Sequence, residues 1–397
     1  MSLLCVALAY AIPAGELATA PVPAQDDKDQ RQAIVALFRA GARIEVDAAD
    51  PSRPVTLVDF SFVLELVDAD LKPLRKLKSL RHLILNGTRI GNEALANVQG
   101  LEHLDTLYLH RTRVTDDGLR HIRGMSELRY LDLSCTGVGD KGLAHVKTLK
   151  ALEHLNLFGT MVSDRGIEDL KGLTKIQSLV LGRTAVTDRG LEQIKGFTEL
   201  EFLNLYGTDV SDEGLVHLKG LSNLNNLVLE ETKVTDKGLE HIKRLTSLRI
   251  LALGITAVTD KGLENLKELK NLNTITLQRT SVTDRGLEQL KGLSELSKLA
   301  LTSTSVTDEG LTSLRESANL QELYLAETSV TDKGLRELAG LKKLRILSLT
   351  LTKVTDEGMK RIAGMTSLEK VYLQLTDVTD DGAKELRKAI PSVEVQR

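Results

Sequence analysis

The chain has 397 residues, of which 42% are apolar and 3% aromatic, and it contains no Trp, so aliphatic side chains must fill its core. The 52 basic and 55 acidic residues give a net charge of −3, which excludes the basic surface typical of proteins that bind nucleic acid or anionic membranes. The two Cys residues, Cys5 and Cys135, are too few for a disulfide framework or a thiolate metal site.

The first 24 residues have the order of a removable secretory leader. Leu3 to Ile12 is apolar, and Pro13 and candidate cleavage sites at 18–20 and 22–24 follow. No Lys or Arg precedes the apolar run, which departs from the usual pattern. The run is too short to span a bilayer, and no other stretch approaches the roughly 18 apolar residues of a transmembrane helix. We expect residues 1–24 to be a signal peptide and the protein to be exported to the periplasm, the cell surface or the medium, with a cytoplasmic protein as the alternative.

Residues 25–65 are expected to form an N-terminal cap. Asp26 to Ala40 has the apolar spacing of a helix, and a Pro51 to Pro54 turn leads to a predicted strand over Val55 to Phe62. The side chains predicted to face inward from the helix are Ile34, Leu37 and Phe38.

A phrase of the type Val-Thr-Asp-x-Gly-Leu then recurs at a step of 24 residues from Val114 to Val378. Degenerate copies begin at Ile90 and Leu66, so thirteen complete 24-residue repeats cover residues 66–377. Residues 378–397 are expected to be a C-terminal cap. A last helix over Gly382 to Ile390 stops at Pro391, and a strand over Val393 to Val395 ends the predicted elements.

Each repeat also carries the pattern Leu-x-x-Leu-x-Leu-x-x-Thr-x-Val, as in Leu104 to Val114. This pattern resembles the strand-and-turn half of leucine-rich-repeat proteins, and the array resembles exported bacterial members of that family over residues 55–397. The family places Asn or Cys where this chain has Thr in all thirteen repeats, from Thr88 to Thr376. The resemblance implies an α/β fold, a right-handed horseshoe-shaped solenoid with a parallel concave sheet and short convex helices.

Three repeated residue types suggest how the coils hold together. Leu119, Ile122 and Met125 have helical spacing and should form an inward stripe. Asp116 and its equivalents, usually after Thr or Ser, are expected to cap the start of each helix. Gly118 and its equivalents should permit close packing between neighbouring coils. The repeated Thr is expected to bond the backbone of neighbouring coils, as an asparagine ladder would.

The sequence shows no constellation typical of catalysis. Of eight His residues, strand alternation places only His82, His110 and His154 on the concave face. His82 and His154 lie about 14 Å apart by strand spacing, too far to share a metal. His110 could approach Asp132, but no nucleophile accompanies the pair. No phosphate loop, zinc-protease phrase or nucleophile elbow occurs. We therefore expect no catalytic residues, no metal and no cofactor.

Aromatic side chains crowd onto one part of the expected concave face. Phe158 and Tyr206 share a column about 10 Å apart by strand spacing, and the repeat between them offers only Ser178, Val180 and Gly182. Such a cleft would suit an apolar or sugar ring. The residues predicted to bind a partner are Tyr108, His110, Tyr130, His154, Asn156, Phe158, Arg183, Phe202, Asn204 and Tyr206.

The most favoured function is therefore non-catalytic recognition or scaffolding, with a protein or peptide partner first and a glycan second. A structural spacer or adaptor without a specialised face is the alternative. The Asp-x-Gly-Leu phrase also resembles repeats in substrate-recognition subunits of ubiquitin ligases. This chain lacks the Cys that usually ends those repeats, and we expect no adaptor-binding domain at its N-terminus, so that resemblance transfers the solenoid and not the pathway.

Overall fold

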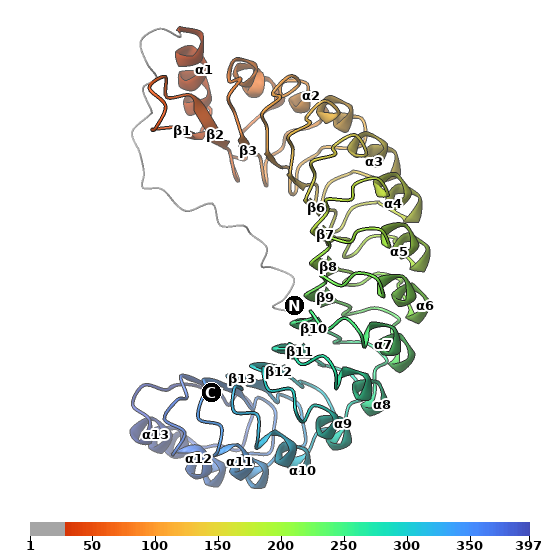
Figure 1. Cartoon of the computed structure of the whole chain (residues 1–397). Coiled ribbons are helices and arrows are strands. Elements are labelled where there is room, and N and C mark those ends of the chain that lie inside the picture. The colour runs from red at the N-terminus through yellow and green to blue at the C-terminus, as the bar shows by residue number, and fades with distance from the viewer. Residues whose placement is uncertain (1–27) are drawn as a thin grey trace. The chain divides into compact units, whose positions relative to one another are not determined.

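The computed structural model describes residues 28–397, and the predicted signal peptide lies outside the described residues. The chain divides into an N-terminal unit, which ends at Leu200, and a C-terminal unit, Glu201–Arg397. Within each unit, short strands lie side by side on one face and short helices cover the other (Figure 1). The strand side is called the strand face below. The α/β solenoid class predicted from the sequence is confirmed in both units.

The N-terminal unit begins with helix α1 (Lys28–Arg39) and an antiparallel hairpin of β1 (Arg43–Val46) and β2 (Val55–Asp59). From β2 onward its strands pair in parallel. These strands are β3 (His82–Ile84), β4 (Thr106–Tyr108), β5 (Tyr130–Asp132), β6 (His154–Asn156) and β7 (Ser178–Val180). The helices that alternate with them are η1 (Asp68–Lys76), α2 (Asn92–Leu95), η2 (Gly118–Ile122), α3 (Asp140–Val146), α4 (Asp164–Leu170) and α5 (Asp188–Ile194).

The hairpin and one side chain of α1 differ from the expectation. Strand β1 was not predicted, and it makes the start of the sheet antiparallel. Ile34 and Leu37 are buried as predicted, but Phe38 is 52% exposed, so its predicted inward orientation is wrong. Ala33 is buried instead, because on a helix it lies one position before Ile34 and one turn before Leu37.

The C-terminal unit repeats the same alternation with parallel pairing throughout. Its strands are β8 (Phe202–Asn204), β9 (Asn226–Val228), β10 (Ile250–Ala252), β11 (Thr274–Thr276), β12 (Lys298–Ala300), β13 (Glu322–Tyr324), β14 (Ile346–Ser348), β15 (Lys370–Tyr372) and β16 (Glu394–Gln396). Its helices are α6 (Asp212–Leu215), η3 (Val216–Leu218), α7 (Asp236–Ile242), α8 (Asp260–Leu263), η4 (Glu264–Leu266), α9 (Asp284–Gln289), α10 (Asp308–Leu311), η5 (Thr312–Leu314), α11 (Asp332–Leu338), α12 (Asp356–Ile362) and α13 (Asp380–Ala389).

Aliphatic side chains from both layers form the core of each repeat. Leu107 and Leu109 point inward from the strand side and are fully buried. Leu119, Ile122 and Met125 come from the helical side and are also buried, as their spacing predicts. Because burying a Leu side chain stabilises a protein by about 1.5–3 kcal/mol, this aliphatic core is the main source of stability in a chain with so few aromatic residues.

A left-handed residue follows the strand in every repeat from 87 to 375. Glycine stands there at Gly87, Gly159 and Gly207, with φ between 63° and 68°. The other repeats place non-glycine residues there, with φ between 53° and 57°. These residues are Arg111, Cys135, Arg183, Glu231, Ile255, Arg279, Ser303, Glu327, Leu351 and Leu375. Since a left-handed L-residue costs roughly 1–2 kcal/mol, each of these turns stores a small strain.

The repeated Thr follows this turn residue, and its bonding differs from the expectation. The Thr208 hydroxyl donates to the Leu205 carbonyl at 2.7 Å, within its own repeat. The same bond occurs in all thirteen repeats. The prediction that these Thr side chains link neighbouring coils is wrong. A Thr side chain reaches only its own turn, whereas the longer Asn of a ladder extends beyond it.

The repeated Asp makes the link between coils instead. Asp236 accepts the Thr259 N–H at 2.7 Å and the Thr259 hydroxyl at 2.7 Å, across the boundary to the next repeat. The Thr259 hydroxyl also accepts the N–H of Lys261, in the first turn of its own helix, at 3.3 Å. The predicted helix cap is thus supplied by the Thr, and the Asp serves as a staple between repeats.

Glycine at the third helical position makes room for this staple. A Cβ added at Gly262 would overlap the Asp236 carboxylate of the preceding repeat, and Gly118 stands in the same relation to Asn92. The predicted role of these glycines in close packing is confirmed. The staple also favours the charged form of the Asp side chain. At Asp356, the hydrogen bonds from Thr379 hold the pKa of the carboxyl below its usual range.

Candidate functional site

The strand face of the N-terminal unit carries a stacked pair of rings. Tyr130 of β5 and His154 of β6 are paired in register on adjacent strands. Their ring centroids lie 4.4 Å apart and their planes differ by 5°. Parallel strands bring equivalent residues about 4.8 Å apart, so this spacing follows directly from an aromatic residue and a His at the same position of neighbouring repeats.

An ion-pair network borders the stacked rings. The Arg129 guanidinium lies 5.6 Å from the centre of the Tyr130 ring, within range of a cation–π interaction. It also binds Glu153 through two bonds of 2.9 and 2.6 Å and approaches Asp105 at 3.7 Å. The hydrogen bonds from Arg129 hold the pKa of Glu153 below its usual range. The network fixes the position of Arg129 beside the rings.

A second polar cluster lies on the same face around His110. The Ser134 hydroxyl donates to Asp132 at 2.5 Å, so it accepts from the His110 Nδ1 at 2.8 Å. His110 was predicted to approach Asp132, and Ser134 connects the two side chains. Burial lowers the pKa of His110, although the Asp132 charge opposes that effect, and the net shift favours the neutral imidazole. Ser134 is 3% exposed and donates its proton to Asp132 instead of to His110. A serine nucleophile would donate to the His, so this arrangement does not activate Ser134.

The predicted partner-binding residues differ in how much surface they offer. Seven of them are half-buried on the strand side: Tyr108, His110, Tyr130, His154, Asn156, Phe158 and Phe202. Arg183 is exposed and has a left-handed backbone. Asn204 and Tyr206 are only 5% and 8% exposed. The Asn204 side chain accepts the Tyr206 N–H at 2.9 Å within the strand turn. These two residues offer little surface. The binding role of the whole set, and the cleft between Phe158 and Tyr206, stay predictions.

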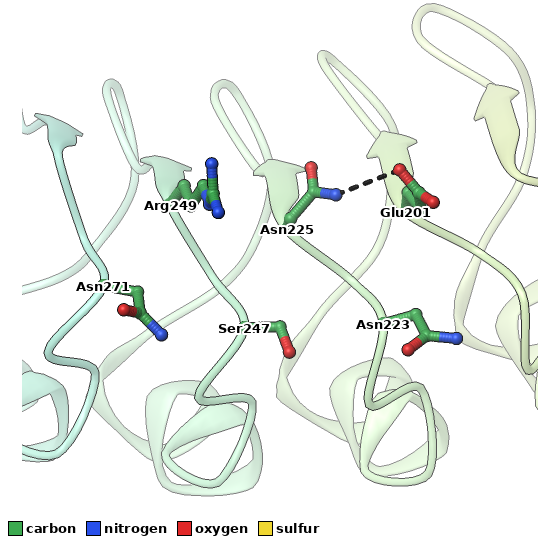
Figure 2. Close-up of a pocket in the computed structure, with 6 residues that line it drawn as sticks. All are labelled: Glu201, Asn223, Asn225, Ser247, Arg249 and Asn271. Atoms are coloured by element: carbon green, nitrogen blue, oxygen red, sulfur yellow. Dashed lines mark hydrogen bonds between the residues drawn. The ribbon is translucent and has the colours of Figure 1, made fainter.

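A polar hollow in the C-terminal unit was not predicted. It measures about 460 Å³ and is lined by six side chains just before strands β8 to β11 (Figure 2). The lining residues are Glu201, Asn223, Asn225, Ser247, Arg249 and Asn271. We call it the amide hollow. The sequence signal is an Asn-Leu-Asn phrase at 223–225 and again at 271–273, two repeats apart, with Ser247 and Arg249 at the same positions between them.

Residues 28–397 contain no group of three or more His, Cys, Asp or Glu side chains that could hold a metal ion. None of the helices in that range is long and apolar enough to cross a membrane.

The strand, left-handed turn, Thr and short helix of each coil have the architecture of a leucine-rich-repeat solenoid. The family model described as Leucine Rich repeat matches residues 126–144, 340–363 and 364–386. A comparison with curated proteins finds no matching sequence.

Solved structures share the fold over most of the chain. An internalin from Listeria monocytogenes is similar over 96% of this chain and 98% of its own, with a TM-score of 0.59 and 21% identity. A leucine-rich-repeat protein from Leptospira interrogans covers 85% of this chain and 95% of its own, with a TM-score of 0.58 and 19% identity. A TDR receptor covers 86% and 63%, with a TM-score of 0.55 and 17% identity. At these identities the similarity concerns the fold alone.

Proposed function

We propose that this chain is a recognition protein that binds a protein or peptide partner on the strand face of its N-terminal unit. Solenoids of this kind generally serve as binding scaffolds rather than catalysts, because stacked repeats create an extended surface. The observation that carries the proposal is the stacked Tyr130–His154 pair beside the fixed Arg129. Tyr and Arg are enriched among residues that dominate binding energy.

The surroundings of the rings support a specific surface rather than a spacer. Tyr108 lies one strand from Asp132, and Asp132 bonds the Ser134–His110 pair. Aromatic, cationic and hydrogen-bonding groups are thus combined within three adjacent strands. A spacer needs only the buried core and the staples, and neither requires these half-exposed groups.

Capture of the partner tests this proposal. The full chain with Tyr130→Ala and His154→Ala should bind the partner from its native source at least tenfold more weakly, because hot-spot truncations cost about 2 kcal/mol or more. Tyr372→Ala, on β15 of the C-terminal unit, is the matched control and should bind normally. Circular dichroism and thermal unfolding verify that all variants fold.

Photo-crosslinking locates the contact independently. A benzophenone amino acid in place of Tyr108 should crosslink to the partner, whereas the same group in place of the exposed Glu168 on α4 should not. Undiminished capture by the double variant, together with crosslinks from the helix side only, would reject the strand face as the binding surface.

We further propose that the protein is exported, on the basis of its leader-like first 24 residues. Mass spectrometry of protein from its native source should find a mature N-terminus near Pro21 or Gln25. An intact chain that begins at Met1 in the cytosol would contradict export.

A further inference from the structure

The amide hollow exists because three successive repeats carry short polar side chains at one position. Asn223, Ser247 and Asn271 form a row along its lower edge (Figure 2). The equivalent positions in later repeats of the same unit alternate between the longer, exposed Glu295 and Lys343 and the short Asn319 and Ser367, so three short residues in succession do not recur there. The longer side chains would extend over the neighbouring repeats, whereas the serine hydroxymethyl between two asparagines leaves open space.

A second row, Glu201, Asn225 and Arg249, borders the hollow above the first (Figure 2). Asn225 donates its amide to Glu201 at 3.2 Å. Asn271 donates its amide to the Thr246 carbonyl at 2.8 Å. Both bonds use the amide nitrogen and fix the side-chain orientation. The side-chain oxygens of Asn225 and Asn271 are thereby held as acceptors.

Arg249 differs from an equivalent arginine elsewhere in the unit. Arg345 occupies the same position before its strand and forms two bonds of 2.7 and 2.8 Å to Glu369 of the next repeat. The neighbours of Arg249 at that position are Asn225 and Asn273. Within residues 201–397, no carboxylate forms an ion pair with Arg249. Glu201 is two strands away, about 10 Å by strand spacing, so the two opposite charges border the hollow without neutralising each other.

We propose that the amide hollow binds an extended peptide segment whose aspartate or glutamate side chain pairs with Arg249. The guanidinium matches a carboxylate through two parallel bonds. The fixed Asn oxygens can accept peptide N–H groups. No aromatic or apolar side chain lines the hollow, which favours a peptide backbone over a sugar ring or an apolar group.

The charges also define the spacing within the ligand. Glu201 attracts a basic side chain and repels a second acid. Because a chain in the extended polyproline II conformation advances about 3.1 Å per residue and places every third side chain on the same side, the roughly 10 Å between the Glu201 and Arg249 positions corresponds to three residues. The preferred segment therefore has an acidic and a basic residue at positions i and i+3. This inference rests on the proposed recognition function and names the ligand chemistry of a second site.

The probe for this site is the capped hexapeptide acetyl-Gly-Asp-Ser-Gly-Lys-Gly-amide, titrated against the full chain by saturation-transfer NMR. We expect binding that weakens about tenfold or more when the peptide Asp is replaced by Asn, since a bond between two charged groups is worth roughly that factor. Arg249→Gln should weaken the Asp peptide equally and leave the Asn peptide unchanged. Arg345→Gln is the matched control and should bind like the parent.

Three results would overturn the proposal: no saturation transfer at millimolar peptide, equal affinity of the parent and Arg249→Gln, or tighter Arg249-dependent binding of a trigalacturonate than of the peptide. The last result would assign the hollow to acidic glycans. The chain with Tyr130→Ala and His154→Ala separates this site from the proposed function, because it should lose partner capture and keep hexapeptide binding. Failure of peptide binding with partner capture intact would reject the hollow alone.

Discussion

Ile255 occupies the least favourable of the left-handed turn positions. Its φ is 56° and its side chain is 40% exposed. A β-branched residue is a genuine outlier in this region, because its branched Cβ crowds the backbone. Asn tolerates the left-handed conformation better than other non-glycine residues. The strain at this turn should therefore be removable by one substitution.

We predict that Ile255→Asn stabilises the protein by about 0.5–1 kcal/mol, since it relieves part of the roughly 1–2 kcal/mol left-handed cost and loses little buried surface. Chemical denaturation monitored by circular dichroism measures the change. Val216→Asn is the control, because Val216 is 39% exposed but has a right-handed φ of −55°. Equal effects of the two substitutions would show that the turn is unstrained.

Residue-level prediction succeeded for the face of the sheet on which a strand side chain lies. Strand alternation placed Tyr130 and His154 on one face, and the structure stacks them. The left-handed turn was missed because Arg, Glu, Ser, Ile and Leu all stand there, so no glycine pattern marks it. Burial of Tyr206 was missed because it depends on the packing of neighbouring side chains, which the two-residue alternation does not describe.

At the scale of the element, the staple joins each helix start to the next one. Asp236 at the start of α7 bonds Thr259, the residue before α8, and occupies the space beside Gly262. The carboxylate and the glycine are thus energetically coupled, although 26 positions separate them in the sequence. From the sequence, each Asp was paired with the Gly of its own helix, as Asp236 with Gly238, because that spacing is typical of the start of a helix.

A double-mutant cycle measures this coupling. Asp236→Ala should destabilise by about 1–3 kcal/mol, because it leaves two donors of Thr259 without their acceptor. Gly262→Ala should cost a similar amount, about 1–3 kcal/mol, through overlap with the carboxylate. In the Asp236→Ala background, the Gly262→Ala cost should fall by at least about 1 kcal/mol. An unchanged cost would mean that the carboxylate does not contact the glycine as described.

At the scale of the whole molecule, stability is distributed between neighbouring repeats. Strand β16 pairs with β15, and Ala383, Leu386 and Ile390 of the last helical segment are buried. In a solenoid the contacts join each repeat to its neighbours only. Damage at the C-terminal end should therefore remain local.

Deleting residues 380–397 tests this locality. Hydrogen exchange should become faster in β15, which loses its partner strand, while the amides of β9 keep their protection. Mass spectrometry after exchange gives both values from the same sample. Uniformly faster exchange from β8 to β15 would instead indicate that the C-terminal unit unfolds as one cooperative body.

The 24-residue step predicted the fold. Because the step is constant, every coil can have the same shape, and equivalent residues then lie on adjacent strands. The amide hollow could not be predicted in this way. It arises because the short Asn223, Ser247 and Asn271 stand in three successive repeats, whereas Glu295 and Lys343 interrupt the short residues of later repeats. The hollow contains no recognised motif. That Arg249 lacks an ion-pair partner within its unit is seen only by comparison with Arg345, which occupies the equivalent position and is paired with Glu369.

The staple between coils has a genetic consequence. The Asp acceptor, the Thr donor and the accommodating Gly belong to neighbouring copies of one phrase. An in-frame duplication or loss of one whole copy therefore joins an Asp to a Thr and a Gly of the same kind, and the new junction is bonded like the others. Unequal recombination can change the number of copies without creating a new interface, whereas a deletion of any other length separates the Asp from its Thr.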